Sequence, residues 1–169
     1  MRPRPILCAL AAALAAGCAS VERPSDPTEI AKAYAEAGRF PEAAREIELA
    51  VRAHPNDPEL RRHAASIQAS AGDLSRAVDH LEIAIRLAPR DAEMWISLGQ
   101  TEMRRRNPAD AYVAFRRAID IAPRDLRAVS GLAVSADSLG FDEEADLAYA
   151  RWAELERERD PSAPAPSRR

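Results

Sequence analysis

The sequence predicts an all-α fold made of stacked helix pairs, because small and helix-breaking residues recur at one fixed interval. A period of about 34 residues fits one helix–turn–helix unit, and such units must stack to bury their apolar faces. Three columns keep this period through the chain: Pro55, Pro89 and Pro123; Ala43, Ala77, Ala111 and Ala145; and Ala50, Ala84 and Ala118. The 169-residue length suits about one domain of this kind.

Apolar residues recur at helical spacing in eight segments, each of which we expect to be a helix. In chain order the expected helices are 27–37, 41–53, 58–71, 74–87, 92–105, 108–121, 126–139 and 142–158. The recurring proline ends the second helix of a unit, since it lacks an N–H donor and disfavours helix in the residue before it.

The turns inside the units are expected at Gly38, Gly72 and Gly140, because glycine adopts left-handed backbone at little cost. In the third unit this position is Arg106, which Asn107 and Pro108 follow. Asn107 can take the left-handed conformation, and a proline suits the first turn of a helix. We therefore expect the turn to persist with different residues.

The best copy of the repeat, residues 92–125, carries apolar and small residues at fixed positions. They are Trp95, Leu98, Gly99, Ala111, Phe115, Ala118 and Pro123, at positions 4, 7, 8, 20, 24, 27 and 32 of the unit. This pattern resembles the tetratricopeptide repeat. The resemblance implies a right-handed α-solenoid over 27–158, with units 24–57, 58–91, 92–125 and 126–158. It also implies close helix contacts at Gly99, Ala111 and Ala118.

The segment 1–17 is expected to be a cleaved secretory signal, because Arg2 and Arg4 precede a short apolar run. The segment "LAAGCAS" is similar to a bacterial lipobox, although Ala15 stands where leucine is usual. That resemblance implies lipidation of Cys18, a tether over 18–26, and a place in the bacterial envelope, with Ala19 favouring the outer membrane facing the periplasm. The alternative is an ordinary secreted protein. Residues 159–169 are expected to be a disordered tail.

The resemblance also implies a concave face lined by first helices, where a protein or peptide would bind. The candidate contacts are Arg62, His63, Ser66, Ile96, Gln100, Met103, Arg104, Arg127 and Val134. Arginine forks suit the carboxylates of a peptide, and Gln100 could hydrogen-bond an extended backbone. The alternative is that these residues are simply solvated helix faces.

Trp152 occupies a position where the repeat usually has alanine, and no fifth unit follows it. It is expected either to cover the end of the solenoid with Tyr149 and Leu155, or to be an exposed anchor for a partner or a second copy. Trp95 is expected to pack in the core.

The composition favours binding over catalysis. The net charge of −3 gives no basic field for nucleic acid. The three histidines lack metal-ligand spacing, and no phosphate loop or nucleophile motif occurs. We therefore expect no enzyme, metal or cofactor. The favoured function is a membrane-anchored scaffold for protein–protein interactions, in pilus or secretion-system assembly. The alternative is an adaptor that recruits peptidoglycan enzymes; the oligomeric state stays open.

Overall fold

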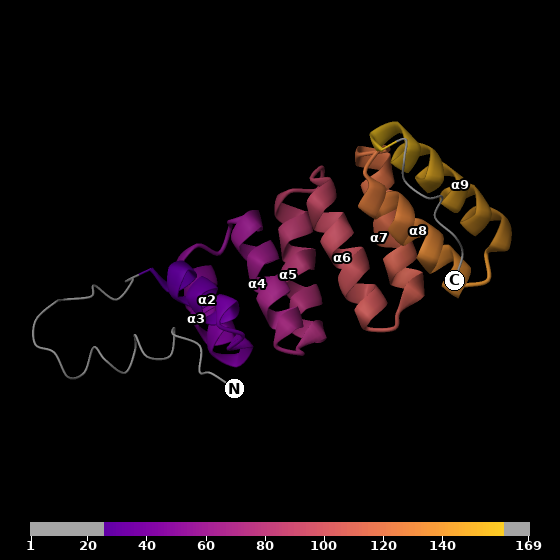
Figure 1. The fold of residues 1–169 in the computed structure, drawn as a ribbon. Coiled ribbons are helices and arrows are strands. Elements are labelled where there is room, and N and C mark those ends of the chain that lie inside the picture. Colours follow the sequence, from indigo (N-terminus) through magenta and orange to yellow (C-terminus); the bar gives the residue numbers. More distant parts are fainter. Residues whose placement is uncertain (1–25, 161–169) are drawn as a thin grey trace, which may run out of the picture.

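The computed structural model describes residues 26–160, and its regular structure in this range is entirely helical (Figure 1). The helices are α2 (Pro27–Glu36), α3 (Phe40–Ala53), α4 (Pro58–Ser70), α5 (Leu74–Leu87), α6 (Ala92–Arg104), α7 (Pro108–Ile121), α8 (Leu126–Ser138) and α9 (Asp142–Arg159). They stack in chain order as antiparallel pairs. The predicted all-α repeat solenoid is confirmed, and every helix boundary lies within one residue of its expected place. The predicted signal peptide, Cys18 and most of the predicted tail lie outside the described residues.

The first helix of each unit begins after an aspartate that caps it. The side chains of Asp57, Asp91 and Asp125 each accept a hydrogen bond from a backbone N–H of the helix that follows, at 2.9–3.0 Å. Each of these aspartates lies two residues after one of the recurring prolines, so the aspartates repeat with the same period. Asp26 caps α2 in the same way. Each such cap contributes about 1 kcal/mol of helix stability.

The turns within the units use left-handed backbone at one residue each. Gly38, Gly72 and Gly140 have φ angles of 73°, 92° and 74°, as predicted. In the third unit Arg106 takes this conformation, with φ of 61°, whereas Asn107 has a φ of −113° and precedes α7. The expectation that Asn107 supplies the left-handed residue is therefore wrong. The period itself fixes the position of the turn, and Arg106 occupies it.

Alanine fills the contacts between helices. The four alanines of the first column, from Ala43 to Ala145, have no exposed surface, and Ala50, Ala84 and Ala118 are at most 2% exposed. First helices of neighbouring units also contact one another, α4 with α6 and α6 with α8. These first helices therefore form one face of the solenoid, and the second helices form the other.

Phe115 on α7 fills the boundary between the third and fourth units, where it is 2% exposed. A Cβ atom built on Gly99 of α6 would lie 2.8 Å from its ring, and one built on Gly131 of α8 would lie 2.4 Å from it. An alanine at either position would therefore require the ring to shift. Gly99 was predicted as a close contact, but Gly131 was not.

Candidate functional site

The predicted partner-binding face contains a depression of about 230 Å³, here called the inner groove, between α4, α6 and α8. It is lined by Arg62, Ala65, Ser66, Ala69, Leu81, Glu93, Ile96, Ser97, Gln100, Thr101, Arg104 and Arg127. Six of the nine predicted contacts are in this set. His63, Met103 and Val134 are not.

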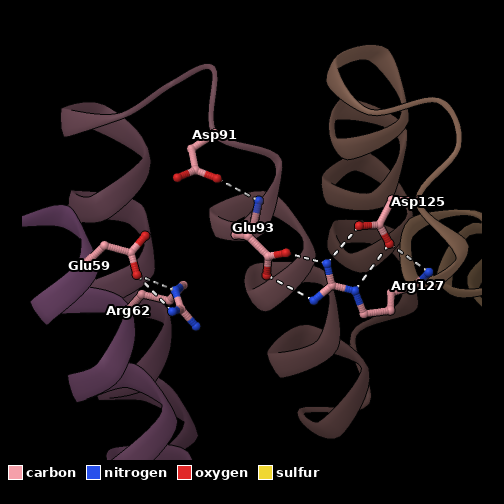
Figure 2. Close-up of polar contacts among 6 residues, drawn as sticks. All are labelled: Glu59, Arg62, Asp91, Glu93, Asp125 and Arg127. Atoms are coloured by element: carbon pink, nitrogen blue, oxygen red, sulfur yellow. Dashed lines mark hydrogen bonds and ion pairs between the residues drawn. The ribbon is translucent and has the colours of Figure 1, made fainter.

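Arg127 joins two neighbouring units across the inner groove (Figure 2). Its guanidinium donates to both carboxylate oxygens of Glu93 on α6, one of them at 3.0 Å. It also donates to Asp125, at 2.7 and 3.2 Å. These hydrogen bonds hold the pKa of Glu93 and of Asp125 below its usual range and raise the pKa of Arg127. Asp125 thus serves both as the cap of α8 and as a partner of Arg127.

The other two arginines of the inner groove are also engaged within the chain. Arg62 donates to Glu59, one turn earlier on α4, at 2.8 and 3.0 Å (Figure 2). Arg104 donates to the carbonyl oxygen of Ala69, near the end of α4, at 2.7 Å. These three arginines are therefore engaged within the chain, and their binding of a peptide carboxylate stays a prediction. They pair with the helix-start acids Glu59 and Glu93, with Asp125, and with the carbonyl of Ala69, which also accepts from the backbone N–H of Gly72.

Neutral side chains supply the free hydrogen-bonding groups of the inner groove. Ser66 and Gln100 are exposed, and neither side chain makes a hydrogen bond to another residue in the described part of the chain. A hydroxyl and a primary amide can both donate and accept, which suits an extended peptide backbone. Polar backbone recognition is therefore better supported here than charge recognition.

The remaining predicted contacts differ in accessibility. His63 is exposed beside Arg62, and Val134 on α8 is 43% exposed. Met103 is half-buried against the cluster around Phe115. Ile96 lines the inner groove but is only 1% exposed and packs in the same cluster, so its role in binding a partner stays a prediction. Ile96 belongs to the core because its helix, α6, contacts both α4 and α8.

Trp152 lies at the end of the solenoid and is half-buried. Its ring centroid is 6.4 Å from that of Tyr149, and Leu155 beside it is 4% exposed. This geometry agrees with the interpretation of Trp152 as a cover for the last unit; its role in binding stays a prediction. Trp95 packs against the Phe115 cluster and donates to the carbonyl of Pro89 at 3.1 Å.

Sequence reasoning missed a polar cluster between the first two units. Glu48 of α3 accepts from Gln68 of α4 at 2.8 Å and pairs with Nε2 of His80 of α5 at 2.9 Å. Burial opposes ionisation of Glu48, but its hydrogen bonds and the nearby positive charge lower its pKa overall. His80 is 7% exposed, and its Nδ1 is buried without a partner. Glu48 and His80 are not one repeat apart, so the period gives no signal for this pairing.

Within residues 26–160, no group of three histidine, cysteine or acidic side chains is placed to hold a metal ion. None of the helices in this range has the length and apolar character needed to cross a bilayer.

The fold and the inner groove define a helical-repeat protein of the interaction-scaffold class. The sequence model of the tetratricopeptide repeat matches residues 28–92 and 68–125, which together make up more than half of the chain. The chain therefore belongs to the tetratricopeptide repeat family, and it is a scaffold for protein–protein interactions. Comparison with curated proteins gave no match.

Solved structures of MamA share the fold. The chain superposes on one MamA crystal structure with a TM-score of 0.74 and 21% sequence identity, covering 80% of this chain and 79% of that one. For "MamA 41-end from Desulfovibrio magneticus RS-1" the TM-score is 0.71 and the identity 23%, over 78% and 75% of the two chains. Identities this low show that the architecture is common and do not extend to a shared partner.

Proposed function

We propose that the protein is a lipid-anchored scaffold that holds a protein partner beside a membrane of the bacterial envelope, in the assembly of a pilus or secretion complex. The observation that carries the proposal is the inner groove, where Ser66 and Gln100 offer unengaged hydrogen-bonding groups between three successive first helices. The ion pair of Arg127 with Glu93 joins α8 to α6 across this groove. A partner segment is then bound by a preformed surface.

The anchor is supported by the sequence around Cys18. Pro27, where α2 starts, lies nine positions after this cysteine. At roughly 3.3–3.6 Å per residue, a fully extended tether reaches about 30 Å. A lipid at Cys18 would therefore keep the solenoid close to the bilayer, where it acts on membrane-associated partners.

The groove is tested by placing a photo-crosslinking amino acid at Gln100 in cells. We expect specific adducts from this position, and none from the same amino acid at Val113, which is 55% exposed on α7. Mass spectrometry identifies the adducts. Pilus or secretin subunits support the proposal, whereas peptidoglycan hydrolases support the adaptor function instead. Equal adducts from both positions would show that the inner groove is not the binding surface.

The anchor is tested separately by Cys18→Ser. We expect the protein to move from the membrane fraction to the soluble fraction, with the cross-links from Gln100 reduced but not redirected. Unchanged partitioning would refute lipid anchoring while leaving the scaffold function intact.

A further inference from the structure

A second depression lies where α3, α4 and α5 meet, in the first two units. It consists of two adjoining hollows of about 310 and 380 Å³, which share Glu48, Arg52 and Arg76. We call this surface the outer trough. Because α3 and α5 are the second helices of their units, it opens away from the inner groove, which runs along the first helices. The residues of both hollows are Pro41, Ala44, Arg45, Glu48, Arg52, Arg61, Arg76, Asp79, His80 and Ile83.

Positive charge is in excess along the outer trough. Arg45 and Arg52 of α3 are exposed, and neither makes a hydrogen bond or ion pair within residues 26–160. Arg61 and Arg76 add two more guanidinium groups, each with a single contact near its own position in the chain. Glu48, which lies near Arg76, and Asp79 offset only part of this positive charge. The surface is therefore cationic in a chain whose net charge is −3.

The repeat shows that the fold does not require these cations. Arg45 and Arg52 occupy positions 22 and 29 of the first unit. The same two positions hold Asp79 and Arg86, then Val113 and Asp120, then Leu147 and Glu154 in the later units. Only the first unit thus carries arginine at both of these positions.

The spacing of Arg45 and Arg52 sets the shape of the ligand. Seven residues along a helix are two turns, or about 10.5 Å. A single phosphate or carboxylate is too small to bridge that distance. Two carboxylates can match it when they are seven residues apart on a helix, or three residues apart on a polyproline II chain, where they lie on the same side at about 3.1 Å per residue.

We propose that the outer trough binds an acidic segment of a protein partner, whose carboxylates pair with Arg45 and Arg52. Arginine forks bind carboxylates bidentately, and Glu48 and Asp79 in the trough disfavour the higher charge of a phosphate. A partner bound here leaves the inner groove open. One copy of the chain can then hold two proteins at once, a property that the inner groove alone does not provide.

The test uses fluorescently labelled synthetic peptides and the full chain at low ionic strength. One probe is a helical peptide with two glutamates seven residues apart, and a second is a polyproline II peptide with two glutamates three residues apart. We expect at least one to bind, and Arg45→Gln or Arg52→Gln to weaken that binding at least fivefold. A peptide with glutamine in place of both glutamates should bind the unaltered protein at least fivefold more weakly as well.

The matched control is Arg117→Gln on α7, which removes another exposed arginine, one that pairs with Asp120. It should leave peptide affinity unchanged. Thermal unfolding of each variant shows that folded proteins are compared, and Arg45→Lys, which keeps the charge without the fork, should retain part of the affinity. The proposal is overturned if neither peptide binds, if Arg117→Gln weakens binding as much, or if inorganic phosphate displaces the peptide at matched ionic strength.

Discussion

The ring of Phe115 contacts two glycines on different helices, and this contact leaves no room for a methyl group on either. Gly99 belongs to the same unit as Phe115, whereas Gly131 belongs to the next. Overpacking of a core costs about 1–3 kcal/mol. Replacing glycine by alanine inside a helix also stabilises the helix by up to about 1 kcal/mol. The net change in the free energy of unfolding therefore depends on how far the ring can move.

We expect Gly131→Ala to lower the free energy of unfolding by about 1–2 kcal/mol, and by more than Gly99→Ala does. The reason is that its Cβ would lie 2.4 Å from the ring, against 2.8 Å at Gly99. Urea denaturation monitored by circular dichroism measures both. Adding Phe115→Leu to Gly131→Ala should restore part of the loss, because the smaller side chain clears the space. A stabilising effect of Gly131→Ala alone would show that the ring adapts freely.

At the scale of helices and turns, the loop between α6 and α7 differs from the other three turns of its kind. Arg106 holds a left-handed conformation there, at φ of 61°, which costs roughly 1–2 kcal/mol for a residue with a Cβ atom. Glycine avoids this cost, but it lowers the free energy of unfolding by about 0.5–1 kcal/mol because it makes the unfolded chain more flexible.

Arg106→Gly is therefore expected to raise the free energy of unfolding by about 0.5–1 kcal/mol. The comparison variant is Arg105→Gly, one residue earlier, where φ is −74° and glycine brings no relief of strain. That change should destabilise the protein. Chemical denaturation of the two variants in parallel tests the argument, and equal effects of the same sign would contradict it.

The helices were predictable because the sequence marks their ends repeatedly. Proline, glycine and the alanine columns recur from unit to unit at one fixed period. A helix end that is poorly marked in one unit can therefore be placed from the same position in the other units. The inner groove was less predictable, because the period predicts which face of the solenoid Arg127 lies on but not which residue it pairs with. Comparing the residues at the same position of adjacent units would have identified Glu93 as the partner of Arg127. The contact of Glu48 with His80 joins different repeat positions of different units, and only the packed structure brings them together.

At the scale of the molecule, the core is divided into three clusters that cross the borders between units. The first joins α2, α3 and α4, another joins α4 and α5 with Leu98 of α6, and the last joins α6, α7 and α8. Each unit is stabilised by its neighbours, as expected for a quasi-one-dimensional repeat protein. Loss of one unit should therefore weaken the adjoining unit most.

Ending the chain after Asp125 removes α8 and α9 and exposes Phe115 and Ala118. We expect amide hydrogen exchange to speed up in α6 and α7, while α2, α3 and α4 keep most of their protection. Mass spectrometry of peptic fragments resolves the two regions. A uniform loss of protection along the whole chain would show that the four units unfold as one cooperative block.

The pairing of Glu93 with Arg127 joins the second position of one unit to the second position of the next. Glu59 holds that same position one unit earlier. A gene deletion that removed residues 92–125 would therefore bring Glu59 opposite Arg127, and an equivalent bridge could form across the new junction. Shorter descendants of this chain could thus arise in a single genetic step without leaving an unmatched charge at the seam.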